Sequence, residues 1–339
     1  MSRGAWAQAY PARPITLVVP FAAGGPTDTI ARIMGERMRA SLGQTIIIEN
    51  TTGAAGSIGV GRVARAEPDG YTIGIGHWST HVVNGAIYQL PYDVLNDFEP
   101  ISLVAANAQL AVVRKSFPAN NLKELIDWLK ANPDKASQGT AGAGSASHVS
   151  GVYFQKETGT RFQFVPYRGT GPAMQDLVAG QIDLMFDQAA NSLPQVRNGN
   201  VKAFAVTAKI ASCRRRPTFR PMDEAGMPGF YISVWHGLWV PKGTPKEITA
   251  KLTGAVVEAL ADPAVRRRPR RSRPGDLRRA ISRRPKRSFA HHKAEIEKWW
   301  PIIKAANASR ASNPSTFRLF LPRILATDRV RSDASRLTA

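Results

Sequence analysis

The apolar positions in the first fifty residues alternate between short β-branched runs and longer stretches with helical spacing. Residues 15–19 read ITLVV and predict a buried strand, which Pro20 ends. A tight turn follows at Gly24, Gly25 and Pro26. Helical spacing then appears in Ile30, Ile33, Met34 and Met38. Thr27 and Asp28 are residue types that favour a helix N-cap, so the pattern predicts a strand, a glycine-rich turn and a helix in that order.

The same order occurs twice more along the chain. Small and hydroxyl residues, namely Thr140, Ser145 and Ser147, precede a helical pattern that runs through Phe154. A strand that begins at Phe162 leads to a Gly-Thr-Gly-Pro turn, a helix over about 172–179 and a strand that ends at Asp187. Backbone N–H groups at helix starts carry partial positive charge and bind carboxylates or phosphates. Each start alone is also typical of an ordinary βα turn, but three of them in both halves of the chain favour a ligand held from two sides.

Length and composition favour two α/β lobes. The chain has 339 residues, which exceeds what one hydrophobic core usually organises. Further helices are predicted over Pro245–Ala261 and Glu295–Ala306, and the aromatic and aliphatic residues of the second are typical of a core contact. No apolar run approaches the roughly 20 residues of a membrane-spanning helix. Cys213 is the single cysteine, so an internal disulfide is excluded.

Five ordered motifs resemble the tripartite tricarboxylate transporter substrate-binding proteins, the Bug or TctC-like family. They are YPARPITLVVPFAAGGPTD, IIIENTTGAAGSIG, EPDGYTIGIG, VPYRGTGPAMQDLVAGQIDLMFD and EIEKWWPIIKAAN, and the match covers roughly residues 8–307 apart from two basic segments. The resemblance implies a two-lobed, Venus-flytrap α/β fold of the periplasmic-binding-protein type, in which each lobe is a mixed or parallel sheet flanked by helices. It also implies a monomeric periplasmic receptor that captures a small carboxylate, such as a di- or tricarboxylate, an amino acid or an aromatic acid, and delivers it to membrane transporter subunits.

The predicted division of the chain follows from this resemblance. Residues 10–108 with 223–307 form lobe 1, residues 109–222 form lobe 2, and residues 308–339 are a disordered or read-through tail. Residues 5–9 read AWAQA, a small-residue cleavage pattern without an apolar stretch before it. We interpret residues 1–9 as the remnant of a signal peptide; a cytoplasmic protein is the alternative.

The resemblance assigns ligand contacts to residues in the matching turns, with no catalytic residue, metal ligand or cofactor. These residues are Phe21, Ala23, Gly24, Gly25, Thr27 and Asp28 in the first turn, Ser79, Thr80 and His81 after the strand at 71–76, Thr140, Gly144, Ser145 and His148 in the second turn, Gly169, Thr170 and Pro172 in the third, and Asp187. Thr27 and Asp28 are equally suited to capping the helix, and His148 to a core or surface position. Asp187 suits a ligand ammonium group, a bridging water or a structural hydrogen bond. His77 and Trp78 replace small residues of the family and are predicted to reshape specificity.

The positive charge is concentrated in three segments. The net charge is +21, and nearly all of it lies in residues 211–221, 266–290 and the tail from 309. Such blocks ordinarily suggest nucleic-acid or anionic-surface binding, which would be strongly salt-dependent. However, family-like codons read one base out of frame yield Arg216–Pro221 and Arg279–Arg287. We interpret the first two segments as compensated frameshifts, with local disorder in 266–290 because of its prolines. Resequencing the gene tests this interpretation; binding through the basic blocks, or a non-functional frameshifted receptor, are the alternatives.

Sequence motifs of common enzyme classes are absent. The chain contains no GxSxG, no HExxH and no grouped histidine or cysteine ligands. The run from Gly142 through Gly144 to Ser147 lacks the third glycine of a dinucleotide-binding turn. The sequence therefore predicts a binding protein rather than an enzyme, without identifying which acid it binds.

Overall fold

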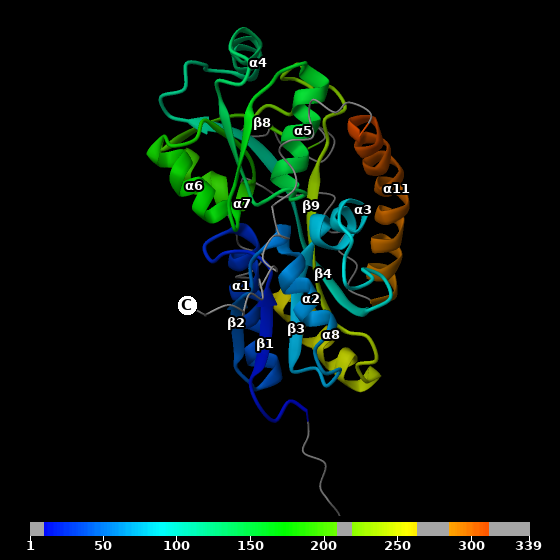
Figure 1. Cartoon of the computed structure of the whole chain (residues 1–339). Coiled ribbons are helices and arrows are strands. Elements are labelled where there is room, and N and C mark those ends of the chain that lie inside the picture. The colour runs from blue at the N-terminus through cyan, green and yellow to red at the C-terminus, as the bar shows by residue number, and fades with distance from the viewer. Residues whose placement is uncertain (1–9, 209–218, 263–284, 312–339) are drawn as a thin grey trace, which may run out of the picture.

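The computed structural model describes residues 10–208, 219–262 and 285–311 (Figure 1). Its strands are β1 (Ile15–Val19), β2 (Ile46–Asn50), β3 (Thr72–His77), β4 (Phe98–Arg114), β5 (Ser137–Thr140), β6 (Gln163–Pro166), β7 (Leu184–Gln188), β8 (Val201–Val206) and β9 (Ser233–Pro241). Its longer helices are α1 (Pro26–Leu42), α2 (Ser57–Ala64), α4 (Leu122–Ala131), α5 (Ala146–Thr158), α6 (Thr170–Ala179), α7 (Ala189–Arg197), α8 (Lys246–Ala261) and α11 (Pro285–Ala311). Three short turns complete it, η1 (Ala54–Gly56), the π-helical turn η2 (Ser79–Val83) and α3 (Asn84–Ile87).

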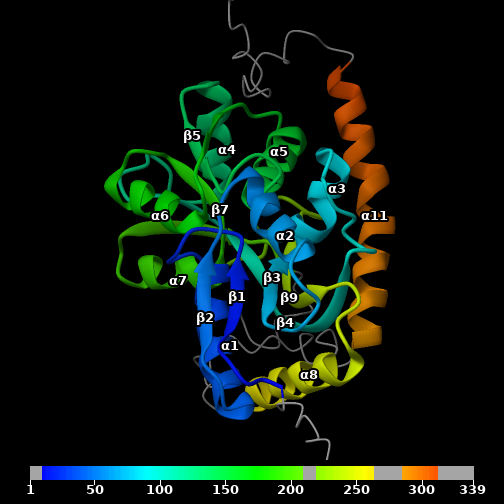
Figure 2. The same cartoon turned by 60° about the horizontal axis from the view of Figure 1, so that its bottom comes forward.

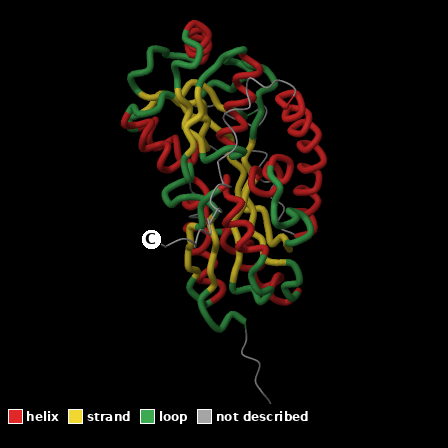
Figure 3. Tube along the Cα trace, in the orientation of Figure 1, coloured by secondary structure: helices red, strands yellow, loops and turns green. Residues whose placement is uncertain are grey.

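The strands form two sheet regions that share the long strand β4 (Figure 3). The order is β2-β1-β3-β9-β4-β7-β5-β6, and β8 also pairs with β4. Up to Ala108, β4 pairs antiparallel with β9, and from Gln109 it pairs with β7 and β8. The chain thus passes from one lobe to the other within a single strand, which supports the proposed boundary after residue 108.

The return to lobe 1 lies close to the start of β9. Phe230 stacks on Tyr153 and packs beside Phe154 and Phe186, all of lobe 2. The Ile232 N–H also donates to the Thr207 carbonyl. These contacts favour a second crossing at β9 rather than after Met222, and we propose this change to the lobe division.

Alternating side chains of β1 determine how lobe 1 is layered. Ile15, Leu17 and Val19 pack with apolar residues of α1 and α8 on one face of the sheet. Val18 points to the other face, where it joins residues of α2 and α11. Figure 2 shows α8 and α11 lying along different sides of this sheet. Lobe 1 is therefore a sheet with helices on both faces.

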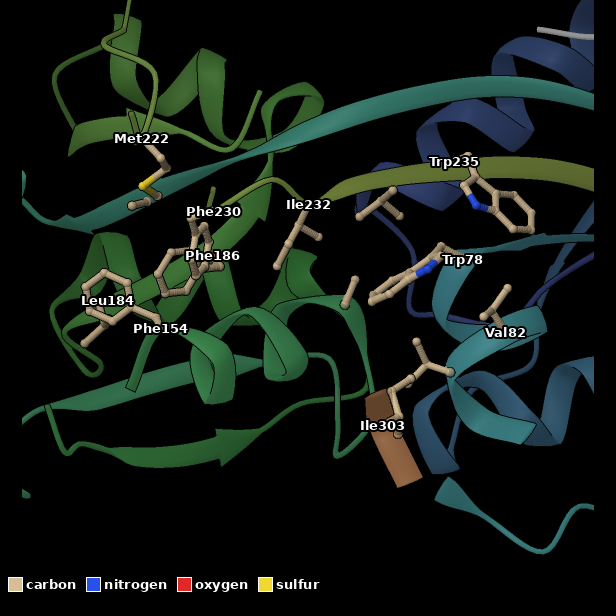
Figure 4. Close-up of a cluster of buried hydrophobic side chains, with 14 of the residues drawn as sticks. Trp78, Val82, Phe154, Leu184, Phe186, Met222, Phe230, Ile232, Trp235 and Ile303 are labelled. Carbon is tan, nitrogen blue, oxygen red and sulfur yellow. The ribbon is translucent and has the colours of Figure 1, made fainter. Parts of the chain in front are cut away.

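Lobe 2 has the same three-layer plan. One face of its sheet packs on α6 and α7 through Leu110, Val112, Leu177 and Met185. The other face packs on α4 and α5, where Phe154, Phe186 and Phe230 form an aromatic cluster (Figure 4). Parallel pairing of β5 with β6 and β7 places the carboxyl ends of these strands at one edge of the sheet, which faces lobe 1.

The last described helix docks on lobe 1, as its apolar pattern predicts. Trp299 meets the Trp78 ring edge-on at 5.0 Å, and the Trp300 indole N–H donates to the Val82 carbonyl at 2.8 Å. The helix is longer than expected because it begins at Pro285, where a first-turn proline has no hydrogen bond to lose. The prediction of local disorder is therefore wrong for residues 285–290. Residues 263–284, like residues 1–9, 209–218 and the tail from 312, lie outside the described residues.

Candidate functional site

A cavity lies between the lobes, at the place where three helices begin. The space there, counted together with its opening to solvent, is about 360 Å³. The lining residues are Phe21, Gly25, Pro26, Thr27, His77, Gln109, Ala141, Ser145, Ala146, Ser147, Thr170, Phe186, Asp187 and Gln188. Lobe 1 supplies the start of α1, and lobe 2 supplies the starts of α5 and α6. The three helix starts that the sequence predicted therefore line one cavity from both sides.

The α1 start is built differently from the sequence prediction. The helix begins at Pro26 with Gly25 as its N-cap and no side-chain cap, so the expectation that Thr27 or Asp28 caps it is wrong. Asp28 instead accepts hydrogen bonds from the Gly24 N–H at 3.0 Å, from Arg32 at 2.9 Å and from Asn50 at 3.0 Å. These bonds lower the pKa of Asp28 despite its burial, and they hold the glycine turn in place from behind.

The α5 start presents hydroxyl groups. Ser145 is the N-cap, and its Oγ accepts from the His148 N–H at 3.3 Å. Ser147 Oγ accepts from the Ala141 N–H and lies 3.0 Å from Ser145 Oγ. The two serines thus link the end of the β5 turn to the helix and place two hydroxyl groups on the cavity.

The α6 start touches the α1 turn directly across the cavity mouth. The Ala22 N–H donates to the Arg168 carbonyl at 3.0 Å, which joins the two lobes by a backbone hydrogen bond. A Cβ added to Gly171 would lie 2.9 Å from the Gly25 nitrogen and 3.0 Å from the Gly24 carbonyl carbon. Only a residue without a Cβ allows this approach, so the structure is a closed form of the cleft.

His77 lines the lobe 1 side of the cavity as a neutral imidazole with a hydrogen-bond donor. Its ring stacks on Phe21 at 4.8 Å, and its Nδ1 accepts from the Ser79 N–H at 3.1 Å. Because Nδ1 must then carry a lone pair, the proton of the neutral ring resides on Nε2. Burial lowers the pKa of His77 to about 3.

We expect His77 to stay neutral, with its proton on Nε2, from about pH 8 down to about pH 5, since its pKa lies well below the ordinary histidine value of about 6.5. Long-range ¹H–¹⁵N NMR spectra of the folded protein report the tautomer and any titration. In urea His77 should titrate near that ordinary value. A His77 resonance that titrates in the folded protein near pH 6.5 would contradict this assignment.

Asp187 lies on the lobe 2 side at the end of β7, where its side chain is 1% exposed. Oδ2 accepts hydrogen bonds from Asn191 Nδ2 at 2.8 Å and from Ser192 Oγ at 2.6 Å. Burial raises the pKa of Asp187 to about 6, although the hydrogen bonds from Ser192 and Asn191, together with the Thr170 side chain and the Gln188 backbone, oppose the shift. Asp187 is the only acidic residue that lines the cavity within the described chain, and no lysine or arginine of that part lines it.

The remaining predicted residues lie around the cavity without lining it. Ala23 and Gly24 are exposed in the first turn. Ser79 and Thr80 lie behind His77 and hydrogen-bond to it, and His81 stacks on Trp239 at a second, mainly apolar cavity. Thr140, Gly144 and His148 shape the β5–α5 turn, since Thr140 Oγ1 accepts from the Gly142 N–H and His148 Nδ1 from the Gly144 N–H. Gly169 faces Ala22 in the interlobe contact, and Pro172 follows in the first turn of α6. Their role as ligand contacts stays a prediction.

Several lining residues carry weak sequence signals. Ser147 belongs to the predicted hydroxyl turn, and His77 stands out as a bulky replacement in its motif. Gln109 and Gln188 have no such signal because they come together only through the antiparallel register of β4 and β7. Gln109 Oε1 also accepts from Ser150 of α5, which ties that helix to the strand.

The family model for the tripartite tricarboxylate transporter family receptor matches residues 30–307. The chain belongs to this receptor family. The receptor is 40% identical over 256 residues to a protein encoded in the ttuE–ttuC' intergenic region of Agrobacterium vitis, covering 76% of this chain and 74% of that protein. The family consists of binding proteins rather than enzymes, which agrees with the sequence prediction.

Solved structures confirm the two-lobed binding-protein fold of the receptor. The periplasmic binding protein BugD has a TM-score of 0.81 and 41% identity, covering 88% of this chain and 99% of that chain. MatC from Rhodopseudomonas palustris, solved with bound malate, has a TM-score of 0.79 and 39% identity, covering 87% and 100%. Within the described part of the receptor, no helix is long and apolar enough to cross a membrane, and no group of side chains suits a metal ion.

Proposed function

We propose that the receptor captures a small carboxylate in the cavity between its lobes and delivers it, outside the cytoplasm, to a tripartite tricarboxylate-type membrane transporter. The observation that carries this proposal is the convergence of the α1, α5 and α6 starts on one cavity that no lysine or arginine of the described residues lines. Helix starts offer backbone N–H groups and partial positive charge, which suit a carboxylate without a counter-ion. The malate in MatC, a relative of the same fold, is a ligand of this class.

Binding by lobe closure follows from the arrangement of the strands. β4 carries the chain between the lobes, and just past the crossing its pairing with β8 has a register irregularity between Ala111 and Val112. Such irregularities bend a strand and are suited to absorb a hinge rotation. The Ala22–Arg168 hydrogen bond joins the cleft rims in the closed form, and the ligand supplies the free energy that keeps it closed.

A thermal-shift screen against small carboxylates tests the proposal. A carboxylate present at one hundred times its dissociation constant should stabilise the receptor by about 2.7 kcal/mol, because it binds the folded state only. The uncharged amide of the same acid is the matched control, and it should give no shift. If the receptor melts cooperatively but none of the mono-, di- and tricarboxylates shifts the transition, the proposed ligand class is wrong.

A further inference from the structure

One buried polar atom in the interlobe cavity lacks a partner. Several buried side-chain atoms have no hydrogen bond within the described residues, and of these only Asp187 Oδ1 belongs to a residue that lines this cavity. Leaving such an atom unpaired is costly, and more so for a charged group. The atom therefore marks the place where a ligand group is needed.

The contacts of the other carboxylate oxygen, Oδ2, determine which oxygen of Asp187 is left for a ligand. Asn191 and Ser192 both donate to Oδ2, and both lie in the first turn of α7. These two donors hold the carboxylate plane and keep Oδ2 an acceptor. At a pH above the raised pKa of Asp187 the carboxylate is ionised, and Oδ1 is then left as a hydrogen-bond acceptor at the end of β7.

The opposite parts of the cavity offer donors. The helix starts supply backbone N–H groups and serine hydroxyls, and His77 supplies Nε2–H because the Ser79 amide occupies Nδ1. A ligand that satisfies both sides needs an acceptor for these donors and a donor for Asp187. An unsubstituted carboxylate provides the acceptor but no donor for Asp187. It also brings a second negative charge near Asp187.

We propose that Asp187 recognises a hydrogen-bond donor on the ligand, so that the cavity selects small carboxylic acids that carry a hydroxyl or ammonium group near the carboxylate. This inference rests on the proposed function, since it concerns the ligand of the same cavity. It adds the chemical group that distinguishes the preferred acids from unsubstituted ones.

Calorimetric titration with matched acid pairs tests the inference on the full chain. The pairs are glycolate and acetate, malate and succinate, and 2-hydroxyglutarate and glutarate, with aspartate and glutamate as the ammonium counterparts of the last two. The pair of fitting length should show a preference of about ten-fold to a hundred-fold for the substituted acid, as expected for a hydrogen bond to a charged acceptor. Equal binding within about two-fold, or tighter binding of the plain acid, overturns the inference while leaving the proposed function intact. If no acid binds, both are overturned.

The Asp187→Asn variant gives a second test, which probes the role of Asp187 directly. Asn191 Nδ2 donates both to Asp187 Oδ2 and to the Thr170 carbonyl, so turning its amide would lose the second bond. We therefore expect the new asparagine to turn its oxygen to Asn191 and its NH₂ group toward the ligand. We expect the preference for the substituted acid to disappear or to invert. Asp183→Asn is the matched control, because Asp183 precedes the same strand and binds Arg114 and Ser137 rather than lining the cavity. A folded Asp187→Asn variant that keeps the wild-type preference would overturn the assignment, and the wild-type pairs test it even if this variant does not fold.

Discussion

Replacing Gly171 with alanine is expected to weaken ligand binding by about ten-fold to a hundred-fold while leaving the unliganded receptor as stable as the wild type. The added Cβ would lie 2.9 Å from the Gly25 nitrogen and 3.1 Å from the Ala23 carbonyl oxygen. Both contacts are with backbone, which cannot move aside as a side chain does. Overpacking of this kind costs about 1–3 kcal/mol, and the cost falls on the closed state alone because the two turns separate when the lobes open.

Isothermal titration calorimetry with the best carboxylate measures this loss, and thermal unfolding without ligand shows whether the fold is intact. Gly254→Ala is the control, since Gly254 lies in α8, where an added Cβ would meet no other atom within 4 Å, and this variant should keep wild-type affinity. A Gly171→Ala variant that binds as tightly as the Gly254→Ala variant would mean that ligand capture does not bring the α1 and α6 turns together.

Truncating Phe154 to alanine is expected to lower the free energy of unfolding of lobe 2 by about 3–5 kcal/mol, the usual loss for a buried phenylalanine. Phe154 is 0% exposed, and its ring lies 5.2 Å from that of Phe186 and 6.2 Å from that of Phe230, measured between centroids (Figure 4). The cluster joins α5, β7 and the segment before β9, so the cavity left by the ring cannot collapse by moving one element alone.

Urea unfolding followed by far-UV circular dichroism measures the effect. The matched control is Val178→Ala, because Val178 is 41% exposed on α6 and its truncation should change stability by no more than about 0.5 kcal/mol. A loss below about 1 kcal/mol for Phe154→Ala would show that this aromatic cluster is not a packed core.

Local sequence predicts most elements of the fold but not every boundary. The β1 strand, the α5 start at Ser145 and the α8 helix follow from β-branched runs, a hydroxyl N-cap and apolar spacing, which act over a few residues. The α1 cap is mispredicted because Pro26 can itself open a helix, which leaves Asp28 free to hold the turn. Similarly, Pro285 interrupts a helical pattern in the sequence but begins α11 in the structure.

The sequence by itself determined a chain of α/β elements with three anion-suited helix starts, because turns, caps and periodicity are local properties of the chain. That the protein is a two-lobed receptor was implied by the resemblance of its motifs to the receptor family. The tertiary structure decided which side chains line the interlobe cavity. Gln109 and Gln188 become neighbours through strand register, Gly171 meets Gly25 through lobe closure, and Asp187 Oδ1 is left unpaired only once α7 has bound Oδ2. These relations join residues far apart in sequence, so they depend on how the elements pack and not on any pattern within one element.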